Sequence, residues 1–223
     1  HHNVFISPPD SELKLLSLAV SERPEALLEV PGQGVLLLCN DGLLVMVNSR
    51  TGNIVHSVEM REDLHPSVNT AEEGCVFGDH ILLTHQKDSK NGKHQGSCVS
   101  VLCAQTLQRV HHVPLPRSRP ELHIKGCRRE RGPNPEVILI LPEIDRVVLT
   151  LDLYGGVAIA KLSNLVDHGR LEMLQYASTH PHGAWGTAFP DRAAIVSTSD
   201  GPRVLVCNAG VDGGVAIIDP KAN

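Results

Sequence analysis

Aromatic side chains and long apolar runs are both scarce in this sequence. Phe, Tyr and Trp make up 3% of its 223 residues, too few for extended stacking on nucleic-acid bases. No window approaches 18 consecutive apolar residues, so the sequence predicts no membrane-spanning helix. The formal net charge of −5 is modestly acidic and disfavours nucleic acid as a partner.

Several motifs of catalysis and cofactor binding are also absent. The sequence has no GxSxG, HExxH or GxGxxG, and its six cysteines never form a CxxC pair. We therefore expect no metal and no cofactor. Cys39 and Cys207 lie within apolar runs, which is typical of reduced thiols buried in a core. This usage favours a soluble, cytoplasmic protein, and the even number of cysteines leaves disulfides open.

A repeat organises the sequence. The run Gly-Gly-Val-Ala-Ile occurs twice, with Val215 lying 58 positions after Val157. Val157 lies 58 positions after Val99, which lies 55 after Leu44, and each stands in a similar apolar run. Such self-similarity indicates a repeat architecture, with a unit of about 56 residues.

Each repeat holds three or four short runs rich in Val, Ile and Leu, separated by Gly, Asp and Asn, the pattern of antiparallel strands joined by tight turns. The repeats run approximately over residues 24–60, 72–116, 136–178 and 192–223, within one domain or fragment spanning 1–223. No convincing helical pattern separates the strands, so we expect helix in less than about a tenth of residues. The sequence predicts an all-β fold, a β-propeller of four-stranded antiparallel blades. A pair of β-sandwiches is the competing interpretation.

The fourth repeat ends after its third strand. The chain is therefore either part of a larger propeller or a four-bladed ring. In a ring, residues 4–7 and 12–20 would circle round to supply the missing outer strand and cover the exposed sheet edges.

The sequence resembles a known family of propellers. Residues 213–223, Gly-Gly-Val-Ala-Ile-Ile-Asp-Pro-Lys-Ala-Asn, resemble the YVTN-type propeller repeat, and residues 50–53 and 104–107 resemble its turn. The order of residues 154–157, 169–171 and 180–183 is similar to the seven-bladed lactonase branch, which includes 6-phosphogluconolactonases and muconate-cyclising enzymes. The resembled families have seven blades, whereas this chain holds about four repeats.

The run from His180 to Trp185 is the most site-like segment. Alternate residues of an extended segment point the same way, so His180 and His182 could converge on a metal or an anion, with Trp185 nearby. The lactonase resemblance implies that His182 faces a central pocket as a general base or polarises a lactone carbonyl. The competing interpretation is a turn whose histidines bond neighbouring blades.

Two further groups of histidines are interpreted as surface features. His56 and the pair His111 and His112 occupy equivalent outer strands, and adjacent strand residues face opposite sides, so the pair cannot chelate as a unit. His80, His85 and His94 surround the polar run 86–97, which we expect to be a solvated hairpin tip, with residues 87–96 exposed.

A basic connector joins the second and third repeats. Its six cationic residues against two glutamates leave a local charge of 6 − 2 = +4. The cationic residues are Arg117, Arg119, Lys125, Arg128, Arg129 and Arg131. The connector is predicted to be exposed and to dock an acidic partner, RNA or phospholipid headgroups; a solvated loop is the alternative.

Two functions from different classes remain. One is a non-catalytic propeller that binds other protein chains as a scaffold or assembly subunit. The other is a lactonase-like hydrolase, or a ligand- or metal-binding propeller, with His182 in a central pocket. The scaffold is favoured because the chain is short for the enzyme and because its acidic and arginine partners cannot be placed here.

Overall fold

The computed structural model describes residues 4–6, 14–16, 24–39, 42–60, 68–87, 97–115, 134–152, 156–179, 189–209 and 213–221. Within them, nearly every element is a strand. The strands are β1 (Val4–Ile6), β2 (Lys14–Leu16), β3 (Pro24–Val30), β4 (Gly34–Cys39), β5 (Leu43–Val47), β6 (Ile54–Glu59), β7 (Val68–Phe77), β8 (His80–Lys87), β9 (Cys98–Cys103), β10 (Arg109–Pro114), β11 (Asn134–Leu141), β12 (Arg146–Asp152), β13 (Gly156–Lys161), β14 (Met173–Ser178), β15 (Phe189–Thr198), β16 (Gly201–Ala209) and β17 (Gly214–Ile218). The helices are η2 (Pro142–Ile144) and α1 (Leu162–His168).

The strands form successive antiparallel meanders. The first sheet has the order β3-β4-β5-β6, the second β7-β8-β9-β10, the third β11-β12-β13-β14, and the fourth β15-β16-β17. Every neighbouring pair is antiparallel and consecutive in the chain. Short Val-, Leu- and Ile-rich runs separated by turns can pair in this way without crossover helices.

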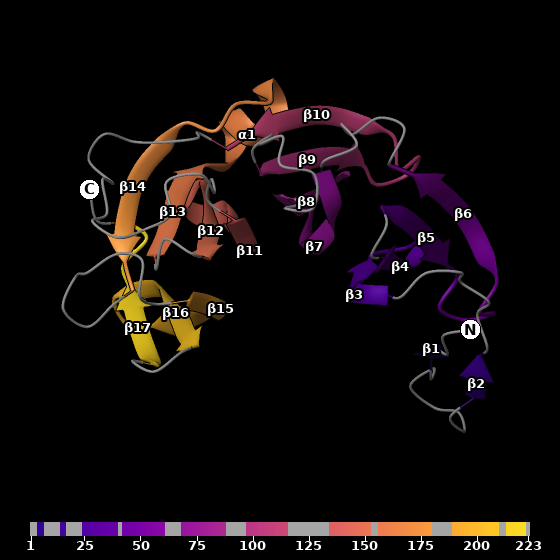
Figure 1. Ribbon diagram of the computed structural model, residues 1–223, viewed down its shortest axis with the longest axis horizontal. Coiled ribbons are helices and arrows are strands. Elements are labelled where there is room, and N and C mark those ends of the chain that lie inside the picture. Colours follow the sequence, from indigo (N-terminus) through magenta and orange to yellow (C-terminus); the bar gives the residue numbers. More distant parts are fainter. Residues whose placement is uncertain are drawn as a thin grey trace.

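The four sheets stand side by side along an arc, with their first strands on its concave side (Figure 1). Successive first strands contact one another: β3 with β7, β7 with β11, and β11 with β15. These features are those of β-propeller blades, so the predicted fold class is confirmed. The β-sandwich interpretation is wrong, because four separate sheets are present instead of two packed pairs.

The repeat positions coincide in the structure. Leu44, Val99, Val157 and Val215 are each the second residue of the third strand of their sheet. Their partners in the second strand are Leu38, Thr84, Thr150 and Cys207. The predicted equivalence is therefore confirmed in strand and in register.

The apolar core lies between the sheets. One cluster joins the first and second sheets and includes Leu38, Leu44 and Leu83. A second joins the second and third sheets, and a third joins the third sheet to Val204 and Val206 of the fourth. Fully burying a Val or Leu side chain contributes about 1.5–3 kcal/mol, so these contacts between sheets are the main source of stability.

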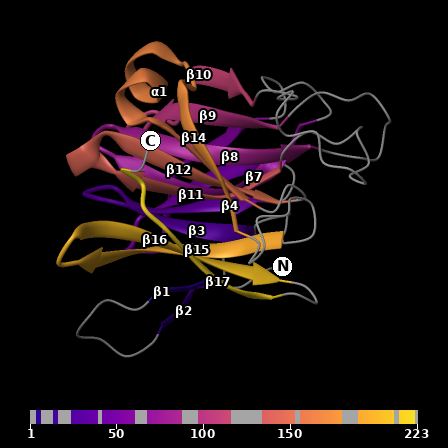
Figure 2. The same ribbon diagram turned by 90° about the vertical axis from the view of Figure 1, so that its left-hand side faces the viewer.

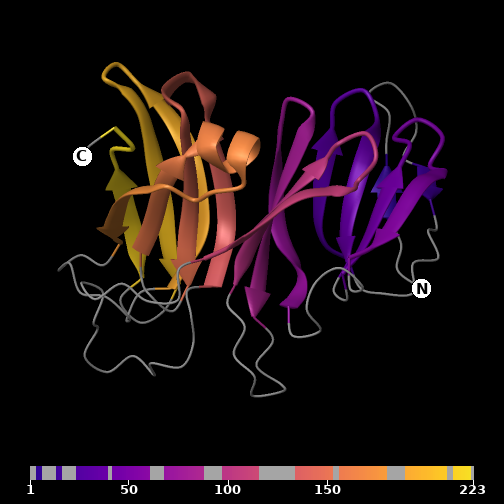
Figure 3. The same cartoon turned by 90° about the horizontal axis from the view of Figure 1, so that it is seen from above.

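Helix α1 was not predicted from the sequence. It replaces a tight turn between β13 and β14 and buries Leu162, Leu165 and Val166, the i, i+3, i+4 face of a short helix. The Asp145 carboxylate accepts hydrogen bonds from the backbone N–H (2.7 Å) and hydroxyl (2.8 Å) of Ser163 in its first turn. Gly169 ends the helix with φ +61°. Figure 3, seen from above, shows α1 close to β10 over the outer strands.

The amino-terminal strands form a small sheet of their own. Strands β1 and β2 pair with each other in a separate two-stranded sheet, and among the described residues β17 pairs with β16 alone. Closure of a ring by residues 4–7 and 12–20 stays a prediction, because much of these two segments lies outside the described residues. No helix in the described part of the chain is long and apolar enough to cross a membrane.

Candidate functional site

The concave side of the arc carries the same irregularity in every sheet. At an equivalent place each first strand contains one residue more than its partner strand, which is a β-bulge; β7 has a second such shift between Val68 and Ala71. Pro24, Ala71, Pro135 and Pro190 pair with Cys39, His85, Leu151 and Asn208, and the register shifts by one immediately afterwards. These four second-strand residues occupy equivalent positions, so the bulge is a property of the repeat.

An acidic residue opens each bulge. The residues are Glu25, Glu72, Glu136 and Asp191. This feature was not predicted from the sequence, although a signal was present: Pro-Glu, Pro-Glu and Pro-Asp lie at or next to the start of the first strand in the first, third and fourth sheets. The backbone therefore places four acidic residues at equivalent points of the concave side.

Two threonines complete the bulges of the central sheets. A bulge leaves backbone groups without a ladder partner. In the second sheet the backbone N–H of Glu73 donates to Thr84 Oγ1 at 3.2 Å, and in the third the N–H of Val137 donates to Thr150 Oγ1 at 2.9 Å. Both threonines are fully buried, so their hydroxyls have a structural role.

Glu73 is a partly buried acidic residue of the second sheet. Burial raises the pKa of its carboxyl, and the positive charge of Arg192 on β15 lowers that pKa in part. Its Oε2 atom is buried and has no hydrogen-bond partner among the residues that the structure describes. Glu73 is thus held at some electrostatic cost, which Arg192 reduces.

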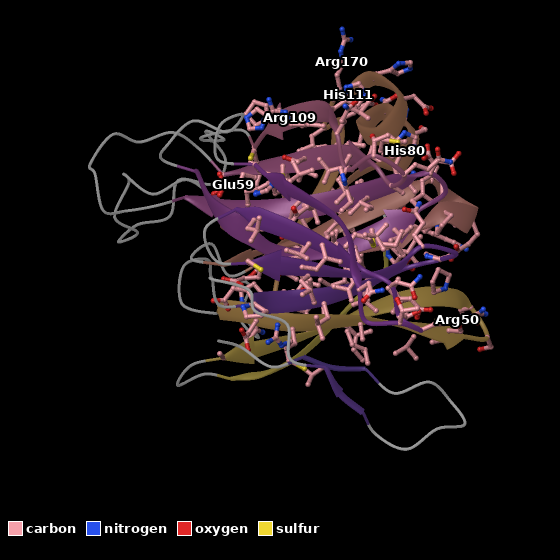
Figure 4. The ribbon with its side chains drawn as sticks, turned by 90° about the vertical axis from the view of Figure 1, so that its right-hand side faces the viewer. Arg50, Glu59, His80, Arg109, His111 and Arg170 are labelled. Carbon is pink, nitrogen blue, oxygen red and sulfur yellow. The ribbon has the colours of Figure 1, made fainter. Side chains whose placement is uncertain are left out.

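The described residues contain no group of three or more His, Cys, Asp or Glu arranged to hold a metal ion. A surface depression of about 580 Å³ lies beside the β3–β4 turn, and its lining includes Glu29, Gln33 and Arg50. Arg50 is labelled in Figure 4. Gly34 is required there, because a Cβ at this position would lie 2.0 Å from the Val47 carbonyl oxygen.

The predicted site residues lie outside the described residues. These are His180, His182 and Trp185 of the proposed ligand site, and Arg117, Arg119, Lys125, Arg128, Arg129 and Arg131 of the basic connector. Residues 88–96 of the expected hairpin tip also lie outside them. Their roles stay predictions.

The outer-strand histidines connect neighbouring sheets. The ring of His56 on β6 hydrogen-bonds from Nε2 to the Thr106 carbonyl oxygen of the second sheet, 3.0 Å away. His111 on β10 packs against Gly169 of the third sheet, where a Cβ would lie 2.8 Å from its ring. Figure 4 shows His111 and Arg170 at the same end of the molecule. His56 is exposed and His111 is half-buried, so these surface histidines also contact the neighbouring sheet.

Two other histidines differ from each other in environment. His112 lies on the outer strand and is exposed overall, but part of its ring is buried. This partial burial, and secondarily the positive charge of Arg109, lower its pKa. His85 was expected beside a solvated hairpin tip, but its side chain is buried, because it belongs to the second strand of a sheet packed on both faces.

The fourth sheet has an open face and an open edge. Val215 and Ile217 are 63% and 70% exposed, whereas the equivalent residues of the other sheets (Leu44 and Met46, Val99 and Val101, Val157 and Ile159) are at most 2% exposed. Figure 2 views the molecule from this side, with β17 toward the viewer. The equivalent residues of the first three sheets are buried because the next sheet packs against this face.

Cys207 shares this environment. It pairs with Val215 and is exposed, contrary to the expectation of a buried thiol. The apolar run around it predicted burial, but only Val204 and Val206 face the third sheet. Cys39 is buried, as expected, and Cys98 is buried as well.

Comparison with known proteins shows the fold alone. No protein-family model and no curated protein matches the chain. Among solved structures it is similar to the "Dos1 propeller" (12% identity, TM-score 0.56, 91% of this chain and 46% of that chain). It is also similar to a quinohemoprotein alcohol dehydrogenase from Comamonas testosteroni (13% identity, TM-score 0.54, 82% of this chain and 31% of that chain). A third similar structure is a europium-containing methanol dehydrogenase (11% identity, TM-score 0.56, 82% of this chain and 37% of that chain). The chain thus spans about a third to a half of the length of these structures, and what it shares with them is the β-propeller fold.

Proposed function

We propose that residues 1–223 form a β-propeller unit that acts as a non-catalytic scaffold and docks another protein chain on its fourth sheet. The observation that carries the proposal is the exposure of Val215 and Ile217 at positions that are buried in every other sheet. Cys207 and the half-buried Leu205 belong to the same face. A contiguous apolar sheet face is typical of an interaction surface.

The test is a double variant, Val215→Lys with Ile217→Lys, compared with a matched control, Val55→Lys with Val110→Lys. The control valines are also exposed, at 60% and 45%, but lie on the outer strands β6 and β10. Proteins that co-purify with the wild-type chain should be retained by the control and lost from the fourth-sheet variant. Both variants should unfold like the wild type in urea. Equal retention by both would contradict the proposal.

The basic connector is a second proposed contact. Charge reversal at Arg128 and Arg129 should weaken capture of an acidic partner, and the loss should be larger at low salt, where screening is least. Intact capture after charge reversal would remove the connector from the interface.

The alternative is a lactonase-like hydrolase, supported by the YVTN-like turn and by the order of residues 154–157, 169–171 and 180–183. The dehydrogenases named above bear on the fold and not on this chemistry, because their identity to this chain is too low. Lactone hydrolysis by the wild-type chain that is lost in His182→Ala, with stability unchanged, would favour the hydrolase over the scaffold.

A further inference from the structure

Cys103 and His80 form a partly exposed pair at one end of the second sheet. They are direct cross-strand partners on β9 and β8, and both are half-buried. The backbone N–H and C=O of Cys103 bond to Gln108 and Leu107 on the side of β10, so they point away from β8. Such a non-hydrogen-bonded pair has its Cα atoms about 4.5 Å apart and its side chains on one face. A thiol and an imidazole at this separation can exchange a proton directly or through one water molecule.

The turn that follows the third strand is built to hold an acceptor side chain. Asn48, Cys103 and Asp219 each stand four residues after the equivalent position of the third strand. Asn48 Oδ1 accepts two backbone N–H groups of its turn, both at 2.9 Å, and Asp219 Oδ1 accepts that of Lys221 at 2.9 Å. A carboxylate thus occupies this place in the fourth sheet, and in the second sheet the sulfur of Cys103 occupies it.

The sulfur of Cys103 receives donors of the same kind. The Thr106 hydroxyl and the backbone N–H groups of Thr106 and Gln105 donate to it. The Thr106 hydroxyl is the largest cause, followed by the two N–H groups, of a Cys103 pKa below its usual 9.0, and the charge of Asp79 acts against them. Burial instead raises the pKa of Cys98 to about 12. The turn therefore favours the thiolate of Cys103, which is the nucleophilic form.

We propose that Cys103 and His80 form a reactive site that takes up a low-molecular-weight disulfide by thiol–disulfide exchange. The inference is independent of the proposed scaffold function. His80 accepts the proton of the Cys103 thiol, and the donors of the turn stabilise the resulting thiolate.

The exchange needs no further reactant. The Cys103 thiolate attacks one sulfur of the disulfide, and a new S–S bond forms as the original S–S bond breaks. The leaving thiolate takes the electron pair of the broken bond and then the proton that His80 accepted. Cys103 is thereby oxidised to a mixed disulfide, and the disulfide is reduced to the thiol that is released.

Cys207 is the internal reference for the test. It is exposed, whereas Cys103 is only half-exposed, so exposure alone would make Cys207 the faster thiol. The probe is dithiodipyridine, an uncharged disulfide, added to the native 223-residue chain. Mass spectrometry of quenched and digested samples gives the modification rate at each thiol. Below neutral pH, Cys103 should react at least about threefold faster than Cys207. A rate at Cys103 equal to or below that at Cys207 would overturn the proposal.

Two variants test the histidine through the pH profile. In His80→Gln the rate at Cys103 should rise only at higher pH than in the wild type, because the proton acceptor is lost, while the rate at Cys207 stays unchanged. The matched control is His112→Gln, since His112 lies opposite Ser100 on the other face of the second sheet. It should leave the profile of Cys103 unchanged. A wild-type profile in His80→Gln would overturn the proposed pair.

Two further variants test the turn. Thr106→Val removes the hydroxyl donor and should slow the reaction of Cys103 below neutral pH, whereas Thr106→Ser keeps the hydroxyl and should retain the rate. Asp79→Asn should speed it, because the charge of Asp79 opposes the thiolate. Urea unfolding shows that each variant is folded. Equal rates in Thr106→Val and Thr106→Ser would overturn activation by the turn.

Discussion

The third and fourth sheets contain the same run, Gly-Gly-Val-Ala-Ile, in different surroundings. Val157 and Ile159 are fully buried, whereas Val215 and Ile217 are mostly exposed. Local sequence, strand type and register are alike. The difference therefore comes from the neighbour: the fourth sheet covers the third, and no described sheet covers the fourth.

This comparison shows that a strand pattern predicts conformation more securely than burial. The face of the first sheet at the other end of the arc, with Leu37 and Val45, is buried in the chain. The two ends of the arc are thus unequal, and among the described residues the fourth sheet is the one with an exposed apolar face.

The largest expected effect contrasts Val157→Asp with Val215→Asp. A carboxylate at position 157 would be buried between two sheets and should cost more than about 4 kcal/mol of unfolding free energy, enough to prevent folding. The same change at position 215 should cost less than about 1 kcal/mol. Urea unfolding measures both. Similar losses at the two positions would show that the face of the fourth sheet is covered.

Thiol labelling tests the same contrast without mutation. Burial raises the pKa of Cys98 from 9.0 to about 12, which lowers its thiolate population about thousandfold. Cys207 is exposed and should react with a maleimide in the native chain, whereas Cys98 should react only after unfolding. Mass spectrometry of the digested peptides identifies the labelled thiol, and Cys207→Ser is the control. Protection of native Cys207 would contradict an open face.

Thr150→Val removes the hydroxyl that accepts the Val137 N–H. The donor would stay buried without a partner, so we expect a loss of about 1–3 kcal/mol. Thr150→Ser should retain most of the stability. Cys207→Val, at the equivalent position of the fourth sheet, should change it by less than about 0.5 kcal/mol. Thermal and urea unfolding check the series, and a neutral Thr150→Val would remove the structural role of the hydroxyl.

The smallest expected effect is at Glu73, whose pKa is raised by burial. Because the carboxyl pKa is higher in the folded chain, the protonated group adds to the free energy of unfolding below its unfolded pKa of 4.5. That contribution is lost as the pH rises through the folded pKa. Glu73→Gln should therefore stabilise the chain at pH 7, by less than about 1 kcal/mol after solvent screening, and the gain should vanish below about pH 4. A gain that is constant with pH would exclude ionisation as its cause.

Much of the fold was predictable, because pairing of short strands depends on nearby residues. The positions of Leu44, Val99, Val157 and Val215 followed from spacing alone, and the structure places them in one register. Helix α1 was missed, because its seven residues carry too few turns for a clear period. The acidic residues at the bulges were less predictable. In three sheets each follows a proline, but two-residue runs of this kind are common, and only the pairing register shows that they occupy equivalent positions.

The sequence by itself determined the strands, their turns and the repeat, since these depend on β-branched runs and on glycine, asparagine and aspartate between them. The tertiary structure alone decided which apolar faces are covered. Val206 and Cys207 are neighbours in one apolar run, yet Val206 is buried against the third sheet and Cys207 is exposed. Alternate residues of a strand face opposite sides, and burial of each side depends on whether another sheet packs there.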